Sequence, residues 1–465
     1  TLSTLYERTI RAVPAVFGAG TMLLLPWLVS GLGPRLGWTT ATVSAWLLAV
    51  SPAMVYYSRT YIQESLFACF TLAFVLGLGR LATGGRRGWA VATGVAAGLA
   101  AATKETAIIV LPAAVLAAGV AGWTVATARR GAGAAGDEAA QVRATWPRGS
   151  GLARLAGIGL ATAVVVAALF YSSFLTVPGG VLEPFRGAGT YLDRGLDPAT
   201  HVHPWHYYVS MLAWSAAGGL RWTEGLILGL ALVGVATAWR RPADADTARH
   251  GAFWARYLAI DALLVLFVFS ALRYKTPWNV LPFLVIAILV AGLGAARLVH
   301  ALPGRLAPAV IAAALAGGLW HLGDQAWRSA VTYGADPRNP YVYAHTVPDA
   351  VRMAGRIHEV AARGEGLVTP VSVIAPPHEQ WPMPWYLRDM PNVGYWIAAD
   401  DPTALSAPLI VASVDQTETL DAVLGDRYVS EYFGLRPEVL LTLYVERDLW
   451  ERYLAAQTGD AGPES

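Results

Sequence analysis

Long apolar runs separated by short charged segments constrain this sequence more than any other feature. The chain has 465 residues, of which 55% are hydrophobic and 14% charged, and its mean hydropathy is +0.44. Soluble domains carry roughly 25% charged residues, and a membrane-spanning helix needs about 20 mostly apolar ones. Ten runs approach that length: 12–30, 39–56, 62–82, 88–103, 105–127, 155–176, 224–239, 257–272, 277–297 and 306–322. The sequence predicts a mostly α-helical, polytopic membrane protein.

The distribution of arginines supports this partition into ten spans. Loops on the cytoplasmic side carry an excess of Lys and Arg. If Thr1 lies outside, the arginine-rich loops all fall on the inner side: 31–38, 80–88, 128–154, 240–256 and 298–305. The outer segments are then the tips 57–61, 104–105 and 273–276 and the loop 177–223. A soluble helical bundle fits poorly, because the runs are apolar on every face. We expect a multi-pass protein of the plasma membrane with both ends outside.

The character of the chain changes after residue 322. Helical periodicity is present at 349–363, 417–424 and 447–456, and short buried strands are indicated at 369–375, 408–413 and 438–445. Alternating helices and strands are typical of an α/β domain. We therefore divide the chain into a transmembrane domain, 1–322, and a small extracytoplasmic α/β domain, 323–465. Segment 128–154 is predicted to be a flexible linker, and the last residues, GDAGPES, a disordered tail.

Charge and cysteine content exclude several classes of function. The net charge of +2 is too small to indicate a nucleic-acid partner, and the arginines are spread over several loops. Cys69 is the single cysteine, so neither an intramolecular disulfide nor a cysteine-based metal site is possible.

Charged residues at the three outer tips are the candidates for chemistry. Ionisable residues near the membrane are costly unless they are paired or hydrated, so they mark functional sites by default. Each tip also has a structural interpretation, as a snorkelling arginine with its carboxylate, a solvated turn or an interfacial anchor. The charged residues are Arg59 and Glu64, Lys104 and Glu105, and Arg273 and Lys275.

Together these residues form a hypothetical site for an anionic lipid headgroup. Arginine donates paired hydrogen bonds to phosphate, and lysine provides a compact cation. We expect Arg59, Lys104, Arg273 and Lys275 to bind the phosphate of a polyprenyl-phosphate donor, which lies in the bilayer with its head at the rim. Sugar transfer also needs a carboxylate base. Glu64 and Glu105 are the candidates, in catalytic or orienting roles.

The outer loop adds a cluster of aromatic and histidine residues, HVHPWHYY, at His201–Tyr208. Such residues suit an interfacial belt, and they also suit contact with a sugar or lipid headgroup. We name Tyr57, His201, His203 and Trp205 as candidate substrate contacts. The spacing of His201, His203 and His206 allows a divalent metal ion, although no cofactor is required by the pattern and no metal ligand is assigned. His378 and Glu379, with nearby tryptophans, indicate either a stacking surface or ordinary domain packing.

Four motifs give the chain a family resemblance: SPAMVYYSRTYIQE, AATKETA, RYKTPWNVLPFL and the segment WPMPWYLRD with the later VGYW. The chain resembles the membrane-embedded glycosyltransferases of the GT-C class, which include the protein O-mannosyltransferases and the lipid A aminoarabinose transferase. It is most similar to bacterial and archaeal proteins described as flippase-activity-associated or family-39-like glycosyltransferases. The resemblance covers nearly the whole chain.

The resemblance implies a polyprenyl-phosphate-linked sugar donor, an active site at the outer face and an inverting single displacement. By position, Lys104 resembles the lysine that binds the donor phosphate and Lys275 the lysine of the late loop, while Arg59 and Glu64 resemble the charged tip after an early span. The class also places an Asp in its first outer loop. Only Glu7 is acidic before Arg11 here. We therefore expect either one more span and an Asp-bearing loop upstream, or a chain that is not catalytically competent as given.

Three functions therefore stand as hypotheses. The first is transfer of a sugar from a polyprenyl-phosphate donor to a lipid, glycan or protein acceptor. The second is a transporter or flippase for lipid-linked sugars, which predicts broken helices at mid-membrane and inverted repeats. The third is a non-catalytic membrane assembly protein.

Overall fold

The computed structural model describes residues 7–131, 150–184, 201–240, 245–301, 306–343 and 345–459. The predictions for most of the linker, for the middle of the outer loop at 185–200 and for the tail from 460 fall outside these residues. The chain divides into two compact units. The helical unit consists of Glu7–Gly334 and Arg338–Tyr341, and the C-terminal unit includes the chain from Val342 onward. The boundary drawn from sequence, at 322, falls within a helix of the first unit.

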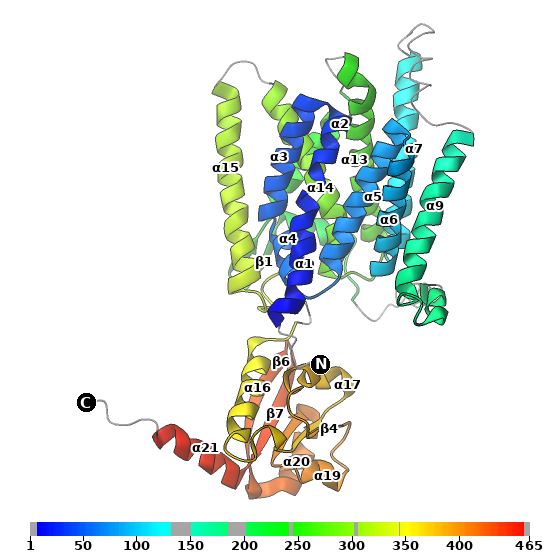
Figure 1. Ribbon diagram of the computed structural model, residues 1–465. Helices are drawn as coiled ribbons and strands as arrows, with labels where there is room; N and C mark the ends of the chain where they lie inside the picture. Colours follow the sequence, from blue (N-terminus) through cyan, green and yellow to red (C-terminus); the bar gives the residue numbers. More distant parts are fainter. Residues whose placement is uncertain are drawn as a thin grey trace. The chain divides into compact units, whose positions relative to one another are not determined.

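The helical unit is a bundle of long helices, seen side by side in Figure 1. Its helical elements are α1 (Glu7–Met22), η2 (Leu25–Leu28), α2 (Val29–Leu32), α3 (Pro34–Val50), α4 (Pro52–Arg59), α5 (Glu64–Gly84), α6 (Arg87–Thr103), α7 (Ala107–Gly131), α9 (Ser150–Tyr171), η3 (Pro178–Leu182), α11 (Tyr207–Ala213), α12 (Gly225–Thr237), α13 (Ala245–Ala271), η4 (Pro277–Val280), α14 (Leu281–Ala301), α15 (Leu306–Trp327) and η5 (Arg328–Thr332). A two-stranded hairpin, β1 (Ser215–Ala217) and β2 (Leu220–Trp222), precedes α12.

Every apolar run predicted to span the membrane is helical. Among the described residues, six helices are long and apolar enough to cross a membrane, or seven if the bent pair α3–α4 counts as one span. Two of the remaining runs form shorter helices, the 17 residues of α6 and the 13 residues of α12. The multi-pass membrane class is therefore confirmed, and the exact number of ten spans stays a prediction.

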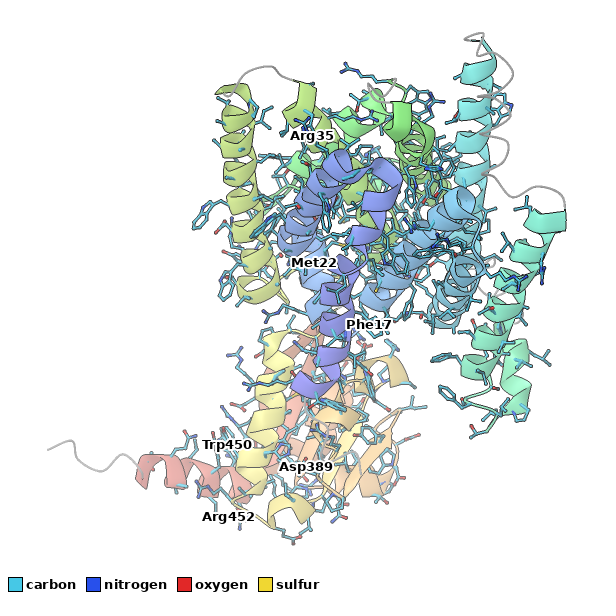
Figure 2. The ribbon with its side chains drawn as sticks, turned by 45° about the horizontal axis from the view of Figure 1, so that its top comes forward. Phe17, Met22, Arg35, Asp389, Trp450 and Arg452 are labelled. Atoms are coloured by element: carbon cyan, nitrogen blue, oxygen red, sulfur yellow. The ribbon has the colours of Figure 1, made fainter. Side chains whose placement is uncertain are left out.

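Small residues bring the helices together. A Cβ atom added at Gly94 of α6 would lie 2.3 Å from the carbonyl oxygen of Gly159 in α9. The two backbones therefore touch, in the small-residue packing that lipid-embedded helices use. Aromatic rings join other helices: Phe17 of α1 (Figure 2) packs edge-on against Phe70 of α5, with ring centroids 5.2 Å apart.

Basic residues gather at one end of the bundle. Thr39 of α3 (Oγ1) lies 3.2 Å from His300 of α14 (Nε2). His300 is also within electrostatic range of Arg35, which Figure 2 labels. At this end the Arg80 guanidinium also lies 4.7 Å from the ring centroid of Trp89. Arg35, Arg80 and His300, from three of the predicted inner loops, therefore lie at one end of the bundle (Figure 1), as the charge pattern predicted. Which side of the membrane that end faces stays a prediction.

The C-terminal unit is a mixed five-stranded sheet between two layers of helices. Strand order is β4-β3-β5-β7-β6, parallel for β4-β3-β5 and antiparallel from β5 to β6. Its elements are α16 (Pro348–Ala361), η6 (Gly366–Val368), β3 (Val371–Ile374), α17 (Pro377–Gln380), α18 (Met383–Tyr386), β4 (Val393–Trp396), α19 (Pro402–Leu405), β5 (Leu409–Ser413), η7 (Val414–Gln416), α20 (Thr417–Leu424), η8 (Gly425–Arg427), β6 (Tyr428–Arg436), β7 (Val439–Glu446) and α21 (Arg447–Gly459).

Alternating residues of the central strands form the two cores of this unit. In β5, Leu409 and Val411 pack with α16 and α21, while Ile410 and Ala412 pack with α19 and α20. This period-2 burial is the pattern that a sheet covered on both faces produces. The three predicted strands and three predicted helices are confirmed. Strands β4 and β6 were not predicted, because both are only partly buried.

Candidate active site

Three side chains from distant parts of the chain meet in the helical unit. Glu64 begins α5, Lys104 follows the last residue of α6, and Asn279 lies in the turn η4 before α14. The Lys104 ammonium donates hydrogen bonds to Glu64 Oε1 and, over 2.6 Å, to Asn279 Oδ1. All three side chains are buried. This Glu64–Lys104–Asn279 cluster joins two of the three charged tips picked out from the sequence.

The break between α6 and α7 explains the position of Lys104. The Lys104 backbone is extended, with φ −157° and ψ 139°, so α6 stops there and α7 restarts at Ala107. The break leaves a polar turn between two apolar helices, and the ammonium points at the first turn of α5. A carboxylate in a first helical turn is favoured by the helix dipole, which suits Glu64 to hold this cation.

The cluster leaves hydrogen-bonding capacity unused. Glu64 Oε2 is buried without a hydrogen-bond partner among the described residues, and so are the hydroxyls of Thr106 and Thr276. An ammonium has three protons, of which two are engaged here. Buried polar atoms without partners are uncommon, and they concentrate where a ligand or solvent completes the site. The cluster is therefore able to receive an anionic oxygen at Lys104.

A second group of predicted residues forms a brace between two loops. The Lys275 backbone N–H donates to the His201 carbonyl (3.0 Å), and the His203 N–H donates to the Arg273 carbonyl (3.4 Å). The Lys275 ammonium donates to the carbonyls of Leu272 and His203. Burial lowers the pKa of Lys275. Lys275 therefore pins the His201–Tyr208 segment against the turn before η4, four residues from Asn279.

One imidazole of this loop, that of His203, has its pKa lowered by its surroundings. Burial lowers the pKa of His203, and the neighbouring charges of Lys275 and His201 lower it further. The His203 ring stacks on Tyr207 with centroids 4.2 Å apart, and His206 Nδ1 lies 2.9 Å from Ser210 Oγ. Within the residues that the structure describes, no three His, Cys, Asp or Glu side chains are grouped as metal ligands.

The remaining predicted residues lie around the cluster rather than in it. Arg59, Glu105, Arg273, His201 and Trp205 are exposed. Glu105 nevertheless lies within electrostatic range of Glu64. The structure thus unites Glu64 and Lys104, links Lys275 to His201 and His203, and leaves the two arginines at the exposed periphery.

Tyr57 takes a different position from the one expected of a substrate contact. Its side chain is fully buried, and its hydroxyl donates to the Tyr341 carbonyl over 2.9 Å. It lies within electrostatic range of Glu64, Tyr207 and Tyr208. Tyr57 is therefore a buried residue, bonded within the helical unit and within electrostatic range of both the cluster and the aromatic loop.

Sequence reasoning missed Asn279 of the cluster and the buried Glu224 elsewhere in the helical unit. Asn279 lies within the motif RYKTPWNVLPFL, but its amide is neutral, and the candidates for phosphate binding and catalysis were all charged residues. Glu224 stands immediately before α12 and its carboxylate is fully buried. A lone acidic residue at the edge of an apolar run was the available signal, and the loop assignment of 177–223 stopped just short of it.

Comparison with known proteins places this geometry in context. Residues 3–131 match the family model of dolichyl-phosphate-mannose-protein mannosyltransferase. ArnT from Cupriavidus metallidurans in the apo state is similar over 95% of this chain and 84% of that chain, with a TM-score of 0.53 and 13% identity. ArnT bound to undecaprenyl phosphate gives the same coverage and TM-score with 14% identity.

The chain has the fold of ArnT. The family match and this shared fold agree with the resemblance drawn from the motifs. The family match spans α1 to α7 and so contains Glu64 and Lys104, whereas Asn279 and Glu224 lie outside the matched residues. None of the curated protein sequences matches the chain significantly.

Proposed function

We propose that this protein transfers a sugar from a polyprenyl-phosphate donor to an acceptor at the outer face of the membrane. The observation that carries the proposal is the buried Lys104 ammonium, held by Glu64 and Asn279 with one proton uncommitted among the described contacts. The structure of ArnT with undecaprenyl phosphate shows that the same fold accommodates such a lipid. A cation at the end of a helix bundle, next to apolar surface, matches an anionic head on an apolar tail.

The roles of the charged residues follow from their burial. Lys104 binds a phosphate oxygen of the donor and stabilises the charge that develops on the leaving group. Glu64 orients Lys104, since it is buried and already paired. Arg59 and Arg273, which are exposed, hold the outer oxygens of the phosphate. Lys275 positions the aromatic loop, whose His201, His203 and Trp205 face the sugar or the acceptor.

The reaction is a single displacement. A hydroxyl oxygen of the acceptor attacks the anomeric carbon of the donor sugar, and the bond between that carbon and the phosphate oxygen breaks. The bonding electrons leave with the polyprenyl phosphate, where Lys104 stabilises them. Glu105, exposed and beside Lys104, accepts the acceptor's proton. The configuration at the anomeric carbon is inverted.

The test is release of polyprenyl phosphate by the purified full chain from a panel of polyprenyl-phosphate sugars, with lipid, glycan and peptide acceptors. We expect release with at least one pair, and a loss of roughly 10²-fold or more in Lys104→Gln, as when a charge-stabilising donor is removed. Arg356→Gln, which breaks an ion pair in the C-terminal unit, is the matched control and should retain activity.

Two outcomes would contradict the proposal. Unchanged turnover in Lys104→Gln removes Lys104 from the site. Movement of a lipid-linked sugar across proteoliposomes without any release of polyprenyl phosphate would replace transfer by transport.

A further inference from the structure

The break between α3 and α4 is held by a carboxylate from elsewhere in the chain. The two helices bend by 58° around Ser51, and Pro52 opens α4. Glu224 Oε2 accepts a hydrogen bond from the Ser51 hydroxyl (2.6 Å), and Glu224 Oε1 accepts one from the Ala53 N–H (2.9 Å). Glu224 thus caps the first turn of α4, where backbone N–H groups lack helical partners and favour an anion.

Tyr341 connects this cap to the middle of α4. Its hydroxyl donates to Glu224 Oε1 (3.0 Å), and its carbonyl accepts from the Tyr57 hydroxyl (2.9 Å). Ser51, Ala53, Tyr57, Glu224 and Tyr341 are all completely buried. Glu224 therefore receives three hydrogen bonds, which is the form in which a buried carboxylate is tolerated.

The far end of α4 leads directly into the candidate active site. Arg59 is its last residue, and after a short turn Glu64 begins α5 and meets Lys104. A helix of eight residues acts as a short lever, so a change of angle at Ala53 displaces Tyr57, Arg59 and the turn that follows. The position of these groups depends on the cap at the opposite end.

We propose that Glu224 is a positioning residue, which fixes the angle of α4 and thereby places Tyr57 and Arg59 beside the Glu64–Lys104–Asn279 cluster. The proposal rests on the function proposed above for its binding readout. Glu224 has no exposed surface and both of its oxygens are engaged, so it acts through α4 rather than on a substrate. Its hydrogen bonds carry the effect, and its charge is not required.

The first experiment measures the position of α4 without reference to activity. Spin labels go on Tyr61→Cys, after α4, and Arg86→Cys, before α6, in a Cys69→Ser background. Both sites have exposed side chains, and α5 between them is 21 residues, roughly 32 Å. We expect a shifted or broadened distance distribution in Glu224→Ala, and an unchanged distribution in Glu224→Gln, whose amide still accepts from Ala53 and Tyr341.

The second experiment measures binding of undecaprenyl phosphate by the full chain in nanodiscs. We expect affinity about tenfold weaker in Glu224→Ala, the loss of one good interaction, an intermediate loss in Tyr341→Phe, and wild-type affinity in Glu224→Gln. Thr237→Val is the matched control, because it removes a hydroxyl bound within α12 (Thr237 Oγ1 to Val233 O, 2.7 Å) and away from α4. If Glu224→Ala does not fold, Tyr341→Phe tests the same cap, because it removes one of the three hydrogen bonds to Glu224.

The outcomes separate the two proposals. A lower melting temperature in Glu224→Ala with unchanged distances shows only a stabilising cap and overturns the positioning role. Loss of binding in Glu224→Gln with unchanged distances shows that the Glu224 charge acts directly on lipid binding. This result also overturns the positioning role. Failure of the wild-type protein to bind undecaprenyl phosphate contradicts the proposed function, while the distance measurement still decides the role of Glu224.

Discussion

Each unit of the molecule contains a carboxylate–cation pair, and the two pairs differ in burial. In the helical unit the side chains of Lys104 and Glu64 are 5% and 2% exposed. In the C-terminal unit the side chains of Arg356 and Glu431 are both 29% exposed, and Arg356 Nη1 contacts both carboxylate oxygens at 2.8 and 2.9 Å. Water reaches the Arg356–Glu431 pair and can bond the polar atoms that the protein leaves without partners. Water does not reach the Lys104–Glu64 pair, so a polar atom there that lacks a protein partner has none.

The difference shows what each pair is suited to do. An exposed pair adds little to stability because solvent screens it. A buried pair repays its desolvation only with excellent geometry and further hydrogen bonds, yet Glu64 Oε2 lacks a partner among the described residues. Such an arrangement is poor for stability and good for binding, since a ligand that completes it gains the missing interactions.

The largest effect expected from this comparison is on stability. Lys104→Met leaves Glu64 buried without its cation and should cost about 3–5 kcal/mol of unfolding free energy, while Arg356→Met should cost less than about 1 kcal/mol. The measurement is thermal and denaturant unfolding of the full chain in detergent. Glu64→Gln added to Lys104→Met should restore much of the loss, and equal losses in the two single variants would remove the distinction between the pairs.

Two further carboxylates, Asp261 in the helical unit and Asp421 in the C-terminal unit, extend the comparison between the two units. Asp261 of α13 is completely buried, and neither carboxylate oxygen has a hydrogen-bond partner among the described residues. Asp421 of α20 accepts from the Tyr444 hydroxyl at 2.8 Å. We expect Asp261→Leu to stabilise the protein by about 1–4 kcal/mol, as apolar replacement of buried charge often does, and Asp421→Leu to destabilise it. A loss of stability in Asp261→Leu would reveal a partner.

The helices of the membrane unit pack by backbone contact, and this too is testable. Gly94→Ala places a methyl group 2.3 Å from the Gly159 carbonyl oxygen, so α6 and α9 must separate, at a cost of about 1–3 kcal/mol. Gly119→Ala in α7 meets nothing within 4 Å and should stabilise its helix by roughly 0.5–1 kcal/mol. Opposite signs in melting temperature are expected, and a neutral Gly94→Ala would contradict the close packing.

Much of the fold could be predicted from the sequence, because hydrophobic runs and arginine spacing are local signals. All ten runs are helical, and Leu409 to Ser413 form the expected strand. The half-buried strands β4 and β6 were missed, since their partners rather than their own composition stabilise them.

The site was predicted only where residues carry charge. Glu64 and Lys104 were found separately, but no spacing in the sequence shows that residues 40 apart form an ion pair. Asn279 was missed because a neutral amide gives no such signal, and Glu224 because its partners Ser51, Ala53 and Tyr341 lie more than a hundred residues away. Long-range polar contacts depend on helix packing, which periodicity does not encode.

The smallest expected effect concerns an exposed pair in the C-terminal unit and its dependence on pH. Burial alone would lower the pKa of His358, but hydrogen bonds to the Ala354 carbonyl and to Asp389 (labelled in Figure 2), 3.0 Å away, raise it above its ordinary 6.5. Burial alone would raise the pKa of Asp389, but the hydrogen bond from His358 lowers it below its ordinary 3.8.

The sign of the pH effect follows from these two shifts. A raised histidine pKa adds stability that is complete below pH 6.5 and is lost as the pH rises through the folded value, while the Asp389 contribution is lost as the pH falls below 3.8. A double-mutant cycle of His358→Gln and Asp389→Asn should therefore show a coupling below about 1 kcal/mol at pH 5.5, and none at pH 9. Because both side chains are partly solvated, a coupling that persisted at pH 9 would mean that the pair behaves like the buried Lys104–Glu64 pair, and that exposure does not separate the two classes.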